Sequence, residues 1–381
     1  MNILHSISSM SPKAGGVSQA LRNLIPNLIQ LGCQNEVVCF DSSGEVYGVK
    51  DDFLVHKIGP SKTPYAYVAQ YQSWLKQNID KFDVVIIHGL WLYNSYGTYL
   101  FLKNIPNIKL YVMPHGMLDP YFQKTADRKL KAFRNEIIWS MLEKKVINNA
   151  TGVLFTCERE MDLANETFKN YHPRKKINVG MGVAKPPVFK QEMQDEFLKI
   201  AQLKKDEPYW LFLSRIDIKK GIDLLLQAYK KLSQNNSNLP KLVVAGPIES
   251  SYAQDLIQTY GGEKNILFTG MLLGNAKWGA IYAAAVFILP SHQENFGIAV
   301  VEAMACAIPV AITNQVNIYP EIEKANAGFI FNDNEAGLEL VLNKLINVSQ
   351  EELTTIGNNA LQCYDDLYTP LDAAHNFMNK I

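Results

Sequence analysis

The sequence lacks the short motifs that most directly indicate a bound cofactor or metal. Neither half contains the Gly-x-Gly-x-x-Gly fingerprint of nicotinamide binding or the Gly-Lys-Ser/Thr of a P-loop. An Asp-x-Asp pair and a clustered set of His and Cys residues are also missing. We therefore expect no cofactor and no metal site.

Cysteine is scarce, with five residues in 381. Their number is odd, their positions are scattered, and most of them fall inside apolar strand or helix patterns. A disulfide framework is therefore not expected, and the cysteines are interpreted as small buried side chains in a reducing compartment. They are Cys33, Cys39, Cys157, Cys306 and Cys363.

An excess of charge and a long apolar run are missing as well. Lys and Arg number 37, as do Asp and Glu, so no global field draws the chain to nucleic acid or anionic lipid. The longest apolar stretch, 299–312, is interrupted by Glu302 and Pro309 and is too short to span a membrane. Residues 1–4 pass almost directly into a strand, so no signal peptide is expected. These features predict a cytoplasmic protein with no nucleic-acid partner.

What the chain does contain is a regular alternation of strands and helices. In the first half, loops follow short apolar strands, and apolar residues at helical spacing follow the first of those loops. The expected strands lie at 3–7, 36–40, 83–88, 108–113 and 151–156. The expected helices include 17–31 and a long one at 128–148. This alternation predicts an α/β fold with a doubly wound parallel sheet.

The second half repeats the same rhythm. Its expected strands lie at 209–214, 241–246, 265–269, 285–289 and 308–312. A length of 381 residues favours two domains. We therefore divide the chain into a first domain at 1–182, a linker at 183–207, a second domain at 208–366 and a C-terminal helix at 367–381 that crosses back to the first domain.

The stretch 290–302 is the most distinctive part of the chain. A buried strand ends at Pro290, a polar loop follows, and an apolar helix runs from about Gly297 to Cys306. Ligands of parallel sheets bind at such strand ends. Glu294 and Glu302 bracket the loop, and Glu302 has only apolar neighbours, so its carboxylate needs a hydrogen-bond partner. A salt bridge or a helix first-turn glutamate is the plainer interpretation.

A basic loop follows the first strand of the second half. Arg215 falls at the strand end, and Lys220 falls five residues later, where a helix begins. A guanidinium fork and an ammonium beside a helix N-terminus are suited to a diphosphate. Taken alone, the loop is more readily interpreted as an ordinary solvated basic loop.

Together these motifs resemble the retaining glycosyltransferases of the glycogen-synthase and sucrose-synthase-like family 4, also called group 1. The segment from His88 to Trp91, His-Gly-Leu-Trp, resembles the branch that builds bacterial exopolysaccharide. The resemblance covers essentially the whole chain. The motifs that carry it are Gly15-Gly16-Val17, His115-Gly116, Arg215 with Lys220-Gly221, and Glu294 with Glu302.

The resemblance implies the GT-B fold, in which two Rossmann-like doubly wound domains face each other across a cleft, and a reaction that needs no metal. The first domain would bind the acceptor and the second a nucleotide-sugar donor, with UDP the expected base and glucose or a related hexose the sugar. The acceptor would be a saccharide or lipid-linked saccharide in polysaccharide biosynthesis.

The resemblance also implies a role for each site residue. Arg215 and Lys220 would hold the diphosphate, Glu302 the ribose, and Glu294 and His115 the transferred sugar. Catalytic roles fall to His115, Glu294, Arg215 and Lys220. The further donor-binding residues would be Gly15, Gly16, Val17, Met271, Leu272, Asn295, Phe296, Gly297, Ile298 and Glu302.

Two questions stay open at the level of sequence. Basic and apolar residues between 124 and 145 form either a membrane-surface patch, which would place the protein at the inner face of the membrane, or a surface helix packed on its own sheet. The function has alternatives too: a nucleotide-sugar epimerase or a non-catalytic nucleotide-sugar-binding protein of the same fold.

Overall fold

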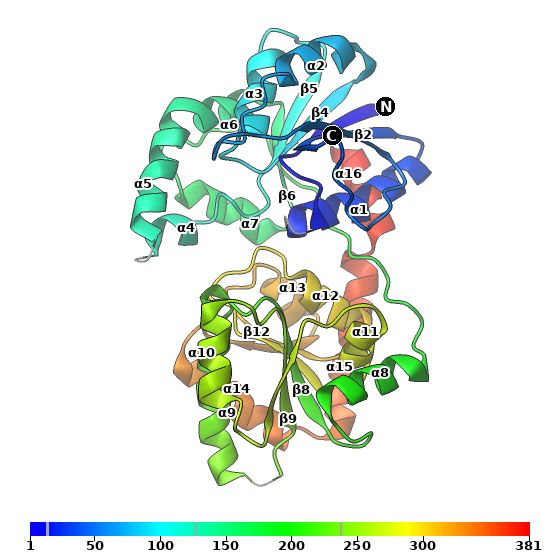
Figure 1. The fold of residues 1–381 in the computed structure, drawn as a ribbon, viewed down its shortest axis with the longest axis vertical. Coiled ribbons are helices and arrows are strands. Elements are labelled where there is room, and N and C mark those ends of the chain that lie inside the picture. The colour runs from blue at the N-terminus through cyan, green and yellow to red at the C-terminus, as the bar shows by residue number, and fades with distance from the viewer. Residues whose placement is uncertain (13–14, 126–127, 237) are drawn as a thin grey trace. The chain divides into compact units, whose positions relative to one another are not determined.

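The protein is represented by a computed structural model that describes residues 1–12, 15–125, 128–236 and 238–381. Internal contacts divide the chain into two compact units. Unit 1 consists of Met1–Gly182 together with Pro370–Ile381, and unit 2 consists of Val183–Thr369. Figure 1 shows the ribbon coloured along the chain.

Unit 1 is built on a sheet of seven parallel strands in the order β3-β2-β1-β4-β5-β6-β7. Each strand is paired in parallel with its neighbours in this order. The strands are β1 (Asn2–Ser6), β2 (Gln34–Ser42), β3 (Leu54–Gly59), β4 (Val84–His88), β5 (Lys109–Met113), β6 (Gly152–Phe155) and β7 (Lys176–Asn178).

The helices of unit 1 alternate with these strands. They are α1 (Gly16–Gln30), α2 (Tyr71–Asn78), η2 (Ile79–Lys81), α3 (Tyr93–Leu102), α4 (Tyr121–Lys124), α5 (Lys129–Ile138), the π-helical segment η4 (Trp139–Glu143), α6 (Lys144–Asn149), α7 (Glu158–Leu163), η5 (Ala164–Glu166) and α16 (Pro370–Lys380).

The sheet of unit 1 is covered on both faces because its strands are apolar at successive positions. Leu4 and Val85 point into a core that also contains residues of α2, α3 and α6. Ile3 and Val84 point the other way, into a core that contains residues of α1 and Phe377 of α16. A doubly wound sheet requires helices on both of its faces. In unit 1, residues 370–381 complete the cover of one face.

Unit 2 has six parallel strands in the order β10-β9-β8-β11-β12-β13. They are β8 (Tyr209–Leu213), β9 (Lys241–Ala245), β10 (Ile266–Gly270), β11 (Val286–Leu289), β12 (Val310–Thr313) and β13 (Gly328–Phe331). Its helices are α8 (Gln191–Ala201), η6 (Ile218–Lys220), α9 (Ile222–Asn235), α10 (Ser251–Tyr260), α11 (Gly274–Tyr282), α12 (Ile298–Ala305), α13 (Tyr319–Lys324), α14 (Glu335–Asn347) and α15 (Gln350–Leu367).

The segment 183–207, expected to be a linker, contains helix α8. That helix packs tightly on α11, since a Cβ built on Gly279 would lie only 1.9 Å from the carbonyl oxygen of Met193. A side chain at position 279 would therefore separate the two helices.

The predicted doubly wound α/β architecture is confirmed, with two Rossmann-like parallel sheets. Every strand expected from the sequence is present, and the structure adds three more, β3, β7 and β13. The single helix expected at 128–148 is wrong in detail, because the five residues of η4 form a π-helical turn between α5 and α6. No helix within the described residues is long and apolar enough to cross a membrane.

Candidate active site

In unit 2, the loops that follow β8 and β11 are held directly against each other. The N–H of His292 donates a hydrogen bond of 2.9 Å to the carbonyl oxygen of Lys219. Gly221 has a φ of +62°, and a Cβ built there would lie 2.0 Å from the carbonyl oxygen of Pro290. Only glycine permits both the backbone conformation and this close approach. The contact brings the two predicted motifs of this unit together.

Glu294 and Lys220 form an ion pair at the centre of this arrangement. Lys220 is buried, and the side chain of Glu294 is 18% exposed. Burial alone would raise the pKa of the Glu294 carboxyl. The positive charges of Lys220 and Lys219, and then of Arg215, outweigh burial and hold that pKa below its ordinary value. Glu294 therefore stays ionised among three cations.

Arg215 also lines a pocket of about 270 Å³ at the carboxyl ends of β8, β9 and β10. Met271 and Leu272, predicted as donor-binding residues, line the same pocket, and Met271 is 62% exposed. Lys277 of α11 lines the pocket as well and donates a 2.7 Å hydrogen bond to Glu302. Sequence reasoning did not point to Lys277. This lysine is a hydrogen-bond partner of the Glu302 carboxylate within the protein itself.

Helix α12 begins in the same loop. Gly297 precedes it with a φ of +79°, and Ile298 is its first residue. Phe296 is buried and packs edge-on against Tyr368, with ring centroids 5.5 Å apart, so the loop is anchored in the core. The first N–H groups of any helix have no partner within the helix and attract negative charge. Asn295 lies beside Phe296, so all four predicted backbone positions are at this helix start.

In unit 1, the loop after β1 leads into α1 through Gly15, which has a φ of +104°. Gly15 precedes the helix, and Gly16 and Val17 are its first two residues. Ser18 donates a 3.0 Å hydrogen bond to the carbonyl oxygen of Gly15. The first turn of α1 carries no acidic residue, so the positive end of its dipole is not neutralised from within.

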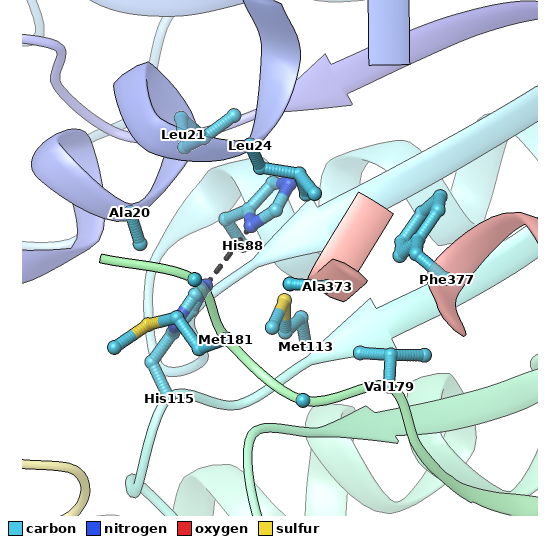
Figure 2. Close-up of a pocket in the computed structure, with 12 residues that line it drawn as sticks. Ala20, Leu21, Leu24, His88, Met113, His115, Val179, Met181, Ala373 and Phe377 are labelled. Carbon is cyan, nitrogen blue, oxygen red and sulfur yellow. Dashed lines mark hydrogen bonds between the residues drawn. The ribbon is translucent and has the colours of Figure 1, made fainter. Parts of the chain in front are cut away.

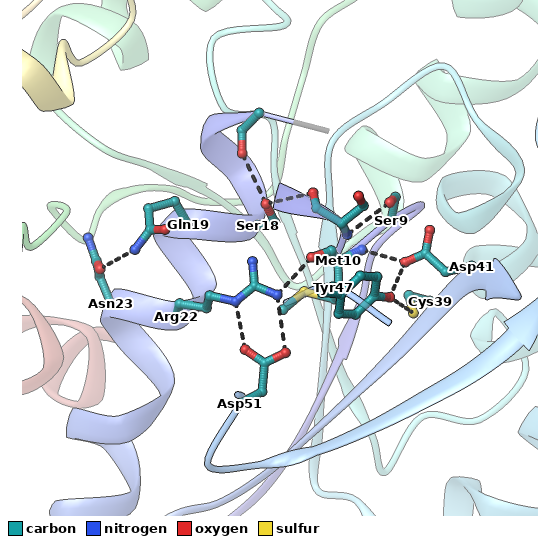
Figure 3. A network of polar contacts seen from close by, with 12 residues as sticks. Ser9, Met10, Ser18, Gln19, Arg22, Asn23, Cys39, Asp41, Tyr47 and Asp51 are labelled. Atoms are coloured by element: carbon teal, nitrogen blue, oxygen red, sulfur yellow. Dashed lines mark hydrogen bonds and ion pairs between the residues drawn. The ribbon is translucent and has the colours of Figure 1, made fainter. Parts of the chain in front are cut away.

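A polar network fixes the start of this loop, as Figure 3 shows. Asp41 accepts a 2.7 Å hydrogen bond from the N–H of Met10 and another from Tyr47. Arg22 of α1 makes a bidentate ion pair with Asp51, at 2.6 and 3.1 Å, and donates to the carbonyl oxygen of Met10. The strand β2, the loop and the helix are thereby tied together.

His115 follows β5 and has a left-handed backbone, with a φ of 52°. Such a conformation is uncommon for a residue other than glycine and persists only where the surroundings enforce it. The carboxylate of Glu160 accepts a 2.6 Å hydrogen bond from the next N–H, that of Gly116, and His88 contacts the His115 ring at 2.9 Å. Both the backbone and the ring of His115 are therefore fixed.

His88 and His115 line a small pocket of about 20 Å³, drawn in Figure 2. The rest of its lining is almost entirely apolar and includes Leu21, Met181 and Phe377. A volume of this size holds about one water molecule. Burial lowers the pKa of His115 to about 4 and that of His88 well below its ordinary value, so both rings are neutral near pH 7.

A second buried glutamate holds the loop that begins with His88 and Gly89. Glu143, the last residue of the π-helical segment, accepts a 3.0 Å hydrogen bond from the N–H of Trp91 and a 2.6 Å bond from Ser95. Trp91 has a φ of 73°, again enforced by a contact of this kind. Burial raises the pKa of Glu143 to about 7, against the lowering effect of the two hydrogen bonds.

The structure thus brings together the predicted residues of each unit. Sequence reasoning missed the residues that hold them: Lys277 beside Glu302, and Glu143 and Glu160 beneath the His-Gly loops. Glu143 and Glu160 carry no usable signal, because charged residues lie beside both: Lys144 and Lys145 follow Glu143, and Arg159 and Asp162 lie next to or near Glu160. Lys277 carries none either. Among the described residues, no group of three His, Cys, Asp or Glu side chains is arranged to hold a metal ion.

This architecture, with two parallel-sheet Rossmann-like units, is the GT-B fold of glycosyltransferases. Residues 193–362 match the family described as glycosyl transferases group 1, and residues 15–177 match the glycosyl transferase 4-like domain. The second half of the chain therefore belongs to the group 1 glycosyltransferases, and the first half carries a glycosyl transferase 4-like domain.

The likeness of this chain to single proteins differs in extent from one to the next. An uncharacterized glycosyltransferase of Methanocaldococcus jannaschii is 32% identical over 124 residues, which are 32% of this chain and only 31% of that protein. The alpha-monoglucosyldiacylglycerol synthase of Streptococcus pneumoniae is 26% identical over 319 residues, covering 78% of this chain and 68% of the relative. The solved structure of the Anabaena protein HepE in complex with UDP-glucose superimposes with a TM-score of 0.74 at 16% identity, covering 100% of this chain and 98% of that one.

Replacing Glu143 by Gln tests whether this carboxyl is protonated when buried. Folding raises the pKa of the Glu143 carboxyl from 4.5 to about 7. The contribution of this group to the stability of the native state is therefore fully present below pH 4.5 and is lost as the pH rises towards 7. From pH 4.5 to 7, the free energy of unfolding of the wild type should fall by on the order of 3 kcal/mol relative to that of Glu143→Gln. Calorimetric unfolding at a series of pH values measures the difference.

The exposed Glu136, on the preceding helix, provides the control. Glu136→Gln should show no such pH-dependent difference from the wild type. If the free energies of unfolding of the wild type and Glu143→Gln differed by the same amount from pH 4.5 to 7, the raised pKa of Glu143 would be contradicted.

Proposed function

We propose that the protein is a retaining glycosyltransferase that needs no metal and moves a hexose from a UDP-sugar to a saccharide or lipid-linked saccharide. The observation that carries the proposal is the cluster of Arg215, Lys219 and Lys220 around Glu294, in the unit that matches the group 1 family. The name of the HepE complex, with UDP-glucose, supports a UDP-hexose donor. A role in exopolysaccharide biosynthesis rests on the resemblance of residues 88–91.

In this proposal, Arg215 and Lys220 bind the donor diphosphate. The exposed guanidinium of Arg215 is available to a ligand in the pocket, and Lys220 is held beside the start of α9. Fixed cations of this kind stabilise the negative charge that develops on a departing diphosphate, an effect typically worth several kcal/mol. Backbone N–H groups at the start of α12 would add to the binding of donor oxygens.

The pocket beside Arg215 would hold the nucleoside. Met271 offers exposed apolar surface for the base, next to the buried Leu272. Glu302 would accept hydrogen bonds from the ribose hydroxyls while keeping its contact with Lys277, which fixes the position of the carboxylate.

In unit 1, Gly16 and Val17 would present backbone N–H groups of the α1 start to donor oxygens, with Gly15 supplying the turn that exposes them. His115 would contact the transferred sugar. Its fixed ring and its enforced backbone conformation support a binding role, since strained residues cluster at functional sites.

Retention of configuration is supported by the groups that could take the proton from the hydroxyl of the incoming saccharide. Glu294 is paired with Lys220 and has a lowered pKa, which makes it a poor base near pH 7. The strongest remaining proton acceptor is the leaving diphosphate. As the bond from the anomeric carbon to the phosphate oxygen breaks, the acceptor hydroxyl attacks that carbon from the same face and passes its proton to the phosphate oxygen, through an oxocarbenium-like species.

A nucleotide-sugar epimerase and a non-catalytic binding protein remain the alternatives. Both would bind the donor through the same cations. Only the transferase yields UDP and a glycoside, whereas an epimerase returns a changed nucleotide sugar. Product analysis therefore separates the three.

A lipid-linked acceptor is supported by an exposed stripe on α5 and η4. Leu130, Phe133, Ile137 and Met141 are spaced along one helix face and are 88, 68, 44 and 61% exposed. Trp139 of the same segment is buried in the core of unit 1, so the segment packs on its own unit through another face and leaves this stripe exposed. Exposed basic residues surround it, and apolar side chains with Lys and Arg suit the surface of an anionic membrane. The basic residues are Lys124, Lys129, Lys131, Arg134 and Lys145. The name of the relative alpha-monoglucosyldiacylglycerol synthase is that of an enzyme making a glycolipid.

Alanine replacement of Arg215 or Lys220 should weaken UDP binding by about 1.5–3 kcal/mol, as expected for hydrogen bonds to charged groups. Arg215→Ala should leave the melting temperature unchanged because Arg215 is exposed. Lys220→Ala should lower it, since Glu294 would lose its partner. Isothermal calorimetry and thermal unfolding give the two quantities, with the exposed Lys205→Ala as control. Wild-type UDP affinity in both variants would remove these residues from the donor site.

Transfer from an α-linked UDP-hexose should give an α-linked product first and should persist in EDTA, because Arg215 and Lys220 supply the positive charge that a metal provides elsewhere. Proton NMR of the first-formed glycoside reads the anomeric configuration. An initial β-anomer, or activity lost in EDTA and restored by Mg²⁺, would overturn the mechanism.

Sedimentation with vesicles tests the membrane surface. The wild type should bind vesicles containing an anionic phospholipid more strongly than zwitterionic ones, and replacing both Leu130 and Phe133 by Ser should weaken binding by tenfold or more, since each buried side chain contributes about 1.5–3 kcal/mol. Leu340→Ser, at another exposed leucine, is the matched control. Equal binding of the double variant and this control would contradict the proposal.

A further inference from the structure

The three histidines His5, His88 and His115 form a continuous chain of hydrogen bonds through the core of unit 1. His5 is on β1, His88 ends β4, and His115 follows β5. The ring nitrogens Nδ1 of His5 and Nε2 of His88 are 3.0 Å apart, and Nδ1 of His88 and Nε2 of His115 are 2.9 Å apart. His5 and His88 are 0 and 3% exposed, so water does not interrupt the chain.

The far end of this chain has a fixed direction. Nε2 of His5 lies 3.0 Å from Oδ1 of Asn35, whose own Nδ2 donates a 3.1 Å hydrogen bond to the carbonyl oxygen of Cys33. A backbone carbonyl can only accept, so it sets the orientation of the Asn35 amide. Oδ1 of Asn35 must then face His5 as an acceptor, and Nε2 of His5 must carry the hydrogen.

The direction passes from ring to ring because a neutral imidazole has one N–H and one bare nitrogen. With its hydrogen on Nε2, His5 accepts at Nδ1, so His88 donates from its own Nε2. His88 then accepts at Nδ1, so His115 donates from its Nε2. Burial lowers the pKa of His5 and His115 to about 4, which is consistent with neutral rings.

We propose that His5 and His88 are positioning residues that lock His115 in the tautomer protonated on Nε2, so that Nδ1 of His115 offers a lone pair to a hydroxyl of the transferred sugar. This rests on the proposed function for the identity of the ligand. His115 is half-buried, and its Nδ1 has no hydrogen-bond partner among the residues that the structure describes.

The chain gives the site a chemical preference. A bare imidazole nitrogen accepts a hydrogen bond from a hydroxyl but repels a carboxylate or phosphate oxygen, which also only accepts. His115 therefore recognises the sugar rather than the diphosphate. It cannot donate a proton from the nitrogen that meets the ligand, so it serves binding and orientation and not acid catalysis.

Two substitutions of His5 separate this role from simple packing. Gln can accept from His88 through its carbonyl oxygen and donate to Asn35 through its amide, so His5→Gln should maintain the direction of the chain. Leu can do neither, so His5→Leu leaves His88 free to reverse its tautomer and donate to Nε2 of His115. The hydrogen of His115 then moves to Nδ1, two rings away from the substitution.

Long-range proton–nitrogen NMR of protein with ¹⁵N-labelled histidine reads these tautomers directly, with His115→Asn assigning the signals. The wild type and His5→Gln should show His115 protonated on Nε2, and His5→Leu should shift the proton towards Nδ1. Calorimetry should show UDP-glucose affinity about tenfold weaker in His5→Leu and restored in His5→Gln, with UDP affinity the same in all three.

Each outcome decides one part of the proposal. A proton on Nδ1 of His115 in the wild type overturns it, and this measurement needs no variant to fold. An unchanged His115 tautomer in a folded His5→Leu also overturns it. A shifted tautomer with unchanged UDP-glucose affinity removes the sugar contact. Equal weakening of UDP and UDP-glucose would indicate general damage to the fold. If the wild type binds neither compound, the proposed function fails while the tautomer result stands.

Discussion

A carboxylate taken out of water must be paired or hydrogen-bonded, because its desolvation otherwise costs several kcal/mol. The loops at the strand ends of both units depend on this constraint. Glu143 and Glu160 accept backbone N–H groups beneath the two His-Gly loops, and Glu294 pairs with Lys220 where two loops of unit 2 meet. Each glutamate has a different partner, but each fixes a backbone turn that carries a site residue. Removal of Lys220 would leave the Glu294 carboxylate without its partner, and removal of Glu143 or Glu160 would release the backbone turn that it holds.

The inner strands could be predicted from the sequence because strands covered on both faces are apolar throughout. The strands that were missed are all at sheet edges. β3 contains His56 and Lys57, β7 has only three residues, and β13 begins with a glycine. An edge strand is half solvated and short, so its composition resembles that of a loop. The π-helical turn at η4 was also missed, since a segment of five residues is too short for its different residue spacing to show in the apolar pattern.

The site was predictable where residues carry chemistry in short motifs and not where they support it from elsewhere in the fold. Arg215, Lys220 and Glu294 were named from spacing, and the structure brings them together. Lys277 lies on a helix with no motif, and its contact with Glu302 joins two segments 25 positions apart. His5 is even less visible, because its significance comes only from pairing β1 with β4, which places its ring against His88.

Helix α16 has a consequence for how the chain acquires its fold. Ala374 and Phe377 are buried in one core of unit 1, beside residues of β1 and α1, although the whole of unit 2 separates these segments in the chain. During synthesis on the ribosome, unit 1 must therefore wait with one face of its sheet incompletely covered until residues 370–381 have emerged. Unit 2 is continuous in sequence and can fold before unit 1 is complete. The segment made first is thus among the last to reach its final state, which reverses the usual order in which domains mature during translation.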